Sequence, residues 1–184
     1  MRTADADILI VPGYTNSGDD HWQSRWEAKL PTAHRVALGD FHKPDKLRWV
    51  DNLATAVASC SRPVILVAHS LGVVTVAHAA PLFPQGVVRG AFLVGLPDIE
   101  QREPVPGLDP AFLPIPRAPL PFPSVLVASR NDPHSAYERA EDFSYAWGSA
   151  LSDAGEAGHL NSESGHGPWP EGLMRFAGFL KTIG

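Results

Sequence analysis

Ser70 lies where a strand-like segment of the sequence changes abruptly into a helix-like one. The apolar run Val64 to Ala68 leads into His69-Ser70-Leu71-Gly72, and a stretch rich in valine and alanine follows at once. We expect a strand, a sharp turn with Ser70 at its tip, and a helix. Such a turn exposes the serine hydroxyl and directs the N–H of Leu71 and the positive end of the helix into the same space. These features suit a nucleophile whose reaction develops negative charge on an oxygen.

Small residues stand two positions before and two positions after this serine, as in the G-x-S-x-G pattern of hydrolase nucleophiles. The tight turn needs them for steric reasons. Ala68 stands in place of the first glycine of the pattern, so its methyl group must still fit. Gly72 is the second glycine. An ordinary strand-turn-helix junction could carry the same five residues, but the charge-free strand and the apolar helix favour a catalytic serine.

A serine hydroxyl is a weak nucleophile at neutral pH and needs a base, normally a histidine oriented by a carboxylate. His159 follows the last predicted strand in a Gly-His-Leu-Asn segment and is the favoured base, with His166 in the same loop as the alternative. For the orienting acid we favour Asp132, which directly follows a strand, over Asp98, which follows the preceding strand. Active sites of open α/β folds collect at this carboxyl edge of the sheet.

The loop after the first predicted strand is expected to complete the site. Gly13 would let the backbone turn so that the N–H of Tyr14 becomes the second oxyanion donor beside that of Leu71. We expect Gly13, His21, Trp22 and His69 to contribute to substrate binding, although Trp22 equally suits core packing.

The elements that must position these residues alternate between strands and helices, which predicts a parallel sheet. The strands are apolar along their whole length, which suits strands covered by helices on both faces. Strands are expected at Ile8 to Val11, Arg35 to Leu38, Val64 to Ala68, Ala91 to Val94, Val125 to Ala128 and Ala150 to Ser152. Helices are expected at Asp19 to Leu30, Lys46 to Ser59, Leu71 to Ala80, Ala136 to Trp147 and Glu171 to Lys181.

One segment differs from the rest in composition. Residues 97–123 hold nine of the chain's 18 prolines, so this connection can be neither a helix nor a central strand. It is either a functional cover over the site or a surface excursion stiffened by proline.

Composition limits the possible functions. The 184 residues are enough for one compact domain, so residues 1–184 are expected to form a single domain. A formal charge of −5 without a basic cluster argues against nucleic acid and anionic membranes as partners. A single cysteine and an acidic N-terminus without a signal peptide make the cytoplasm the expected location. We expect no cofactor and no metal, because the glycine fingerprints of nucleotide sites and the usual metal-ligand spacings are missing.

The segments quoted above, together with His21-Trp22-Gln23-Ser24-Arg25-Trp26 and the stretch from Gly158 to Pro170, resemble a known family. This is the family of small single-domain serine hydrolases that includes a retinoblastoma-binding protein and its bacterial relatives. The resemblance spans essentially the whole chain. It implies a three-layer α/β/α sandwich, a reduced α/β-hydrolase fold with about six parallel strands in the order 2-1-3-4-5-6 and no separate lid domain. It also implies that Ser70, Asp132 and His159 form the catalytic triad.

We therefore expect a serine hydrolase that cleaves a carboxylic ester or amide-type bond through an acyl-enzyme intermediate. Its substrate would be a small-molecule or peptide acyl compound, and the protein would be a monomer or homodimer. The alternative is a protein-binding or regulatory module on a hydrolase scaffold with little or no turnover, since fold does not imply function.

Overall fold

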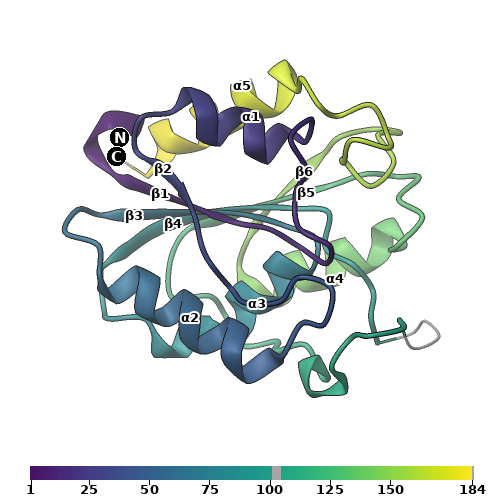
Figure 1. Ribbon diagram of the computed structural model, residues 1–184. Helices are drawn as coiled ribbons and strands as arrows, with labels where there is room; N and C mark the ends of the chain where they lie inside the picture. Colours follow the sequence, from purple (N-terminus) through teal and green to yellow (C-terminus); the bar gives the residue numbers. More distant parts are fainter. Residues whose placement is uncertain (101–104, 184) are drawn as a thin grey trace.

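The computed structural model describes residues 1–100 and 105–183, and its centre is a parallel β-sheet (Figure 1). The sheet is six-stranded, with the order β2-β1-β3-β4-β5-β6, and each neighbouring pair of strands is parallel. The strands are β1 (Asp7–Val11), β2 (Ala33–Arg35), β3 (Val64–His69), β4 (Val88–Val94), β5 (Ser124–Ala128) and β6 (Ala150–Asp153). The predicted fold class and strand order are confirmed.

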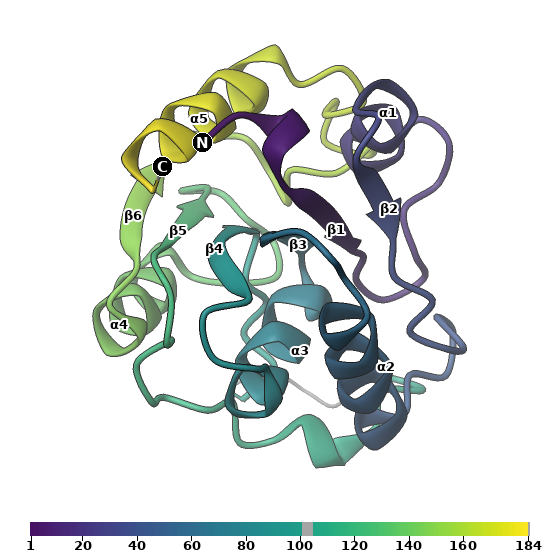
Figure 2. The same cartoon turned by 90° about the vertical axis from the view of Figure 1, so that its left-hand side faces the viewer.

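Helices cover both faces of this sheet, so the molecule has three layers (Figures 1 and 2). The first face carries α1 (Trp22–Lys29) and α5 (Pro170–Thr182), and the second carries α2 (Lys46–Ala58), α3 (Leu71–Ala79) and α4 (Tyr137–Trp147). Residues 63–88, which include no Asp, Glu, Lys or Arg, contain β3 and α3. Within the described residues, no helix combines the length and the apolar character that crossing a membrane requires.

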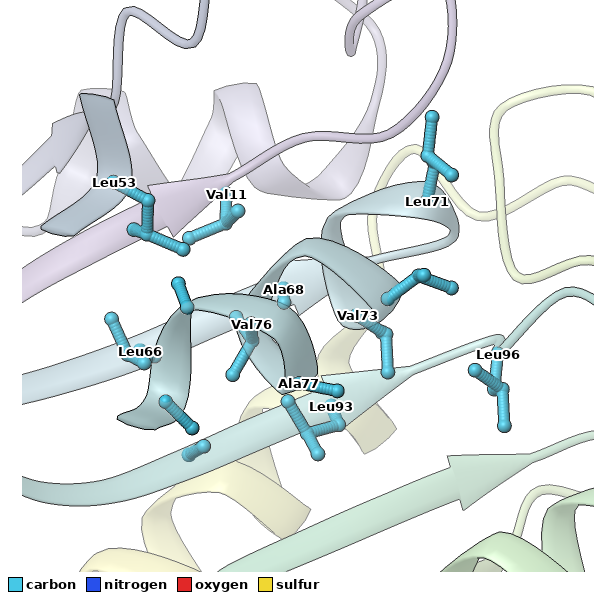
Figure 3. Packing of buried hydrophobic residues seen from close by; sticks show 14 of the residues in the cluster. Val11, Leu53, Leu66, Ala68, Leu71, Val73, Val76, Ala77, Leu93 and Leu96 are labelled. Carbon is cyan, nitrogen blue, oxygen red and sulfur yellow. The ribbon is translucent and has the colours of Figure 1, made fainter. Parts of the chain in front are cut away.

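Each layer has its own apolar cluster, and the strands contribute to both. In β1, Leu9 and Val11 are buried in the cluster under α2, α3 and α4, while Ile8 and Ile10 are buried in the cluster under α1 and α5. Successive side chains of a strand point to opposite faces, so a strand buried on both faces must be apolar throughout. Figure 3 shows the packing of Ala68 and neighbouring strand residues against α3.

The second strand and the first helix begin at different residues from those predicted. β2 runs from Ala33 to Arg35. The N–H of Val36 still donates to the carbonyl of Ile10 in β1 at 2.9 Å, and Val36 and Leu38 are buried in the cluster that includes α2. α1 begins at Trp22 and not at Asp19. His21 is its N-cap, since its Nδ1 atom accepts a hydrogen bond from the N–H of Gln23.

The proline-rich segment is tied to the sheet layers at several points. In its described parts, 97–100 and 105–123, the only regular element is η3 (Pro110–Phe112), while residues 101–104 lie outside the described residues. Phe112 is fully buried in the core, and the indole N–H of Trp147 in α4 donates to the carbonyl of Pro116 at 2.8 Å. The segment is therefore partly core, and its first part lines the candidate site described below.

Candidate active site

Ser70 occupies the junction between β3 and α3 in a backbone conformation that residues with a side chain rarely adopt. Its φ and ψ are 54° and −126°. Such backbone strain costs about 1–3 kcal/mol and persists only where the surroundings hold it. The Ser70 N–H donates to the carbonyl of Val94 at 3.0 Å, and the Ser70 carbonyl accepts from the N–H of Val73 at 2.8 Å. The turn is thus fixed to β4 on one side and to α3 on the other.

Two glycines allow the surrounding backbone to approach this turn. A Cβ atom added at Gly72 would lie 2.3 Å from the carbonyl oxygen of Val11, and one added at Gly13 would lie 2.7 Å from the Cβ of Ser70. Neither position has room for a side chain. The methyl group of Ala68 is accommodated, because it points into the apolar cluster and is fully buried.

His159 lies between Ser70 and Asp132, within hydrogen-bonding distance of both. Its Nε2 atom is 2.9 Å from the Ser70 Oγ, and its Nδ1 atom is 2.8 Å and 3.0 Å from the two Asp132 oxygens. A carboxylate accepts hydrogen bonds, so Nδ1 carries the proton and Nε2 is free to accept the serine hydroxyl. The alternative base, His166, contacts Ser164 instead, at 3.1 Å between Nδ1 and Oγ.

The alternative acid has a different partner. The Oδ2 atom of Asp98 lies 3.0 Å from the Nε of Arg139 in α4, and both side chains are largely buried. Asp132, on the loop after β5, is the carboxylate that the structure brings to His159. Sequence reasoning left both aspartates open with Asp132 favoured, and its role as the orienting acid stays a prediction.

The two residues whose N–H groups are the predicted oxyanion donors, Tyr14 and Leu71, line one cavity together with Ser70. In the described part of the chain, neither the N–H of Leu71 nor that of Tyr14 donates a hydrogen bond to another backbone group. A Cβ at Gly13 would lie 3.1 Å from the Leu71 nitrogen, so the loop that carries Tyr14 runs beside the start of α3. The Tyr14 hydroxyl donates to the carbonyl of Pro106 at 3.0 Å, which links this loop to the proline-rich segment.

Three further histidine rings lie near His159, each tilted or edge-on to its neighbour, and the ring of His134 lies 4.4 Å from that of His159. The rings of His69 and His159 lie 4.9 Å apart, and those of His21 and His69 lie 4.8 Å apart, measured between centroids. Burial, with a smaller contribution from the charge of Arg35, lowers the pKa of His21 to about 4. Burial also lowers the pKa of His69 well below its usual value. Both imidazoles are therefore neutral at pH 7 and place no positive charge beside His159.

A cavity of about 360 Å³ opens above Ser70. Of the predicted substrate-binding residues, His21 and His69 line it, as does Tyr14. Gly13 lies against Ser70 instead, and Trp22 is fully buried outside the cavity, where its indole N–H donates to the carbonyl of Leu160 at 2.8 Å. Trp22 is thus placed in the core that supports the site.

Several lining residues were not singled out from the sequence. They are Thr15, Asn16 and Gly18 from the loop after β1, Pro97, Ile99, Val105 and Leu108 from the proline-rich segment, His134 from the loop after β5, and Asn161, Ser162 and Glu163 from the loop after β6. Their position after a strand end is a signal that could have pointed to them, but many loop residues share that position. Among the described residues, no group of three or more His, Cys, Asp or Glu side chains is arranged to hold a metal ion.

Known proteins resemble this chain in sequence and architecture. Residues 8–178 match the model of a protein family described as serine hydrolase. A structure from Pectobacterium atrosepticum, described as a YdeN-like hydrolase, is 34% identical in sequence and has a TM-score of 0.84, with 98% of this chain and 94% of that chain covered. A search of curated protein sequences finds no match.

More distant structures share the fold alone. The ydeN gene product of B. subtilis is 18% identical with a TM-score of 0.73, over 96% of this chain and 99% of that chain. Esterase 2 of Thermogutta terrifontis is also 18% identical, with a TM-score of 0.64 over 100% of this chain and 86% of that chain.

Proposed function

The chain belongs to the serine hydrolase family, and on that premise we propose that it hydrolyses carboxylic esters or related acyl bonds by two-step acyl transfer. The observation that carries this proposal is the continuous chain of contacts from the Ser70 hydroxyl through both ring nitrogens of His159 to Asp132. A serine, a base and an orienting acid in this order are the parts that a serine nucleophile needs.

In the first step, the Nε2 atom of His159 takes the hydroxyl proton while the Ser70 Oγ attacks the substrate carbonyl carbon. Negative charge develops on the carbonyl oxygen, where the N–H groups of Leu71 and Tyr14 stabilise it. Asp132 stabilises the imidazolium that forms. The tetrahedral intermediate then collapses, the bond to the leaving group breaks, and His159 gives its proton to that group, which leaves an acyl ester on Ser70.

In the second step, water replaces the leaving group. His159 takes a proton from the water as its oxygen attacks the acyl carbon, and the same two N–H groups stabilise the oxyanion. Collapse of this intermediate breaks the bond to Ser70, whose oxygen recovers the proton from His159. The carboxylic acid is released and the enzyme returns to its starting state.

The residues that line the cavity indicate where the acyl group and the leaving group of the substrate would lie. Tyr14, Ile99 and Leu108 pack against the apolar cluster under α2 and α3, so they form an apolar wall. The lining residues that follow His159 in the chain, 161–163, are all polar. The leaving group must lie within reach of the His159 Nε2 atom to receive its proton. We therefore propose an apolar acyl group joined to a polar leaving group.

The cavity volume also limits substrate size. At about 360 Å³, it is near the lower end of the roughly 300–1,000 Å³ that ligand pockets usually span. A small acyl compound fits this volume better than a long peptide does.

The test is labelling with a fluorophosphonate, followed by intact-mass measurement, on wild type and Ser70→Ala. We expect stoichiometric labelling of the folded wild-type protein and none of the variant. Hydrolysis of p-nitrophenyl esters of graded chain length, beside amide analogues, then identifies the bond. Absence of Ser70-dependent labelling in folded protein would leave the alternative function, a protein-binding module with little or no turnover.

Four other expectations stay predictions. They are the organisation of residues 1–184 as one domain, the cytoplasmic location, the monomeric or homodimeric state, and the specific likeness to the retinoblastoma-binding protein.

A further inference from the structure

The segment that carries the base is held by side chains from other elements, one for each successive residue. We call residues 157–160 the base segment. The N–H of Ala157 donates to the Oγ of Ser129 at 2.9 Å, and the N–H of Gly158 donates to the Oδ1 of Asn131 at 2.7 Å. Both acceptors lie on the loop after β5, which also carries Asp132. The first half of the base segment is therefore fixed to the acid's loop.

The second half of the base segment is held through its carbonyl groups. The Nε2–H of His69 donates to the carbonyl of His159 at 2.9 Å, and the indole N–H of Trp22 donates to the carbonyl of Leu160 at 2.8 Å. A carbonyl can only accept, so the tautomer of His69 is fixed by this contact. Both donors are buried, and water therefore cannot easily replace them.

The backbone of the base segment needs such support. Gly158 and Leu160, which flank His159, have φ values of 58° and 53°. Glycine adopts this left-handed conformation freely, but leucine does not, because its Cβ approaches the backbone. A strained residue keeps its conformation only where its surroundings over-determine it. The contact of Trp22 falls on this strained residue.

The first turn of α1 is itself fixed to the strands that carry the nucleophile and the proposed oxyanion loop. The side-chain amide of Gln23 donates to the carbonyls of Val11 and Val67, at 3.2 Å and 3.1 Å, near the carboxyl ends of β1 and β3. The Gln23 Oε1 atom accepts from the Ser17 hydroxyl at 2.6 Å. Trp22, the preceding residue, thus reaches the base segment from a firmly anchored point.

We propose that Trp22 and His69 are positioning residues, which hold His159 at hydrogen-bonding distance from Ser70 by fixing the carbonyl groups of residues 159 and 160. This inference rests on the proposed function. It assigns Trp22 a role beyond core packing, and it makes the first turn of α1 the common support of the nucleophile strand and the base segment.

The first test compares Trp22→Phe with Trp26→Phe, in purified full-length protein. Each variant keeps an aromatic ring in the same buried cluster, but only the first removes the donor to Leu160. Misplacement of a catalytic group by about 1 Å can cost about 100-fold in rate. We expect kcat for a p-nitrophenyl ester to fall about 10- to 100-fold in Trp22→Phe with KM within about twofold of wild type. Trp26→Phe, at a similar melting temperature, keeps kcat within about threefold.

Equal kcat values in these two variants at matched stability would overturn the inference. If wild type shows no Ser70-dependent fluorophosphonate labelling, the proposed function is wrong, and the inference that rests on it is wrong as well. If wild type is labelled and both tryptophan variants are labelled at its rate, only the positioning role fails.

A second pair of variants decides the matter if Trp22→Phe does not fold. Gln can present an N–H at about the place of the His69 Nε2, whereas Met has a similar length and no donor. We expect His69→Gln to keep at least about fivefold more kcat than His69→Met, with similar KM values and melting temperatures. Equal loss of kcat in both variants would overturn the role of the hydrogen bond.

Discussion

The Oδ2 atom of Asp98 lies 3.0 Å from the Nε of Arg139, and this ion pair holds the aspartate after β4 against α4. The same guanidinium also contacts Glu100, at 2.5 Å from its Oε2 atom. Two aspartates follow neighbouring strands at one edge of the sheet, yet they have different partners. Asp98 anchors the start of the proline-rich segment, and Asp132 contacts His159, the proposed base.

This difference predicts opposite results for two matched substitutions. Asp132→Asn keeps the shape of the side chain but removes the charge that orients His159, so kcat should fall about 10³- to 10⁴-fold with little change in melting temperature. Asp98→Asn should leave kcat within about threefold. It should lower the free energy of unfolding by about 1.5–3 kcal/mol, because the largely buried Arg139 loses one charged partner and keeps Glu100. Steady-state kinetics and urea denaturation measure both effects, and a larger kcat loss in Asp98→Asn would contradict the assignment.

Gly72→Ala should disrupt the nucleophile turn. The added methyl group would lie 2.3 Å from the carbonyl oxygen of Val11, so β1 and α3 would have to separate. Overpacking of this kind costs about 1–3 kcal/mol or more, and kcat should fall because the turn also positions Ser70. Gly178→Ala in α5 is the matched control. Apart from its chain neighbours and the nearby backbone of its own helix, no heavy atom lies within 4 Å of the added Cβ, and the substitution should stabilise the helix by about 1 kcal/mol. Equal stability of the two variants in urea denaturation would refute the steric argument.

His21 should make stability depend on pH. Burial lowers its pKa in the folded protein to about 4, whereas an unfolded histidine titrates near 6.5. Below about pH 6.5, the unfolded chain binds a proton that the folded protein does not, so stability falls as the pH falls toward 4. The full contribution is on the order of 3 kcal/mol.

His21→Asn tests this dependence, since asparagine keeps a good N-cap for α1 and removes the imidazole. Its free energy of unfolding, measured from pH 7 to 4, should fall less steeply than that of wild type. His34→Asn, which removes an exposed imidazole, is the matched control. The idea fails if the His21→Asn slope equals that of wild type.

Leu108→Trp should narrow the cavity along its apolar wall. The larger side chain leaves less space for the acyl group, so the preference among p-nitrophenyl esters should shift toward shorter chains. Each methylene that no longer fits should cost about 10-fold or more in kcat/KM. Leu113→Trp, at an exposed position of the same segment outside the cavity lining, should keep the wild-type preference. A shift in both variants, or in neither, would show that Leu108 does not contact the acyl group.

The sequence by itself determined the elements and the candidate nucleophile. Ile8 to Val11 and Val64 to Ala68 are apolar on every residue, and this pattern reports burial on both faces of a strand. Small residues around Ser70 indicate a tight turn, because the residues that would clash in such a turn are close neighbours in the chain. The proposed base and acid could be named because parallel strands end at one edge, although two residues competed for each role.

Only the tertiary structure shows which of those competing residues come together. Ser70 and His159 are 89 positions apart in the chain and meet at 2.9 Å, while His166, seven residues further on, turns to Ser164. The tertiary structure also decided where Trp22 lies. The sequence pattern is the same for a tryptophan whose indole N–H reaches the Leu160 carbonyl and for one that lines a cavity. The local sequence pattern specifies which face of a helix or strand is buried. Which side chains meet between loops that are distant in the chain depends on how the whole chain folds and where each strand ends.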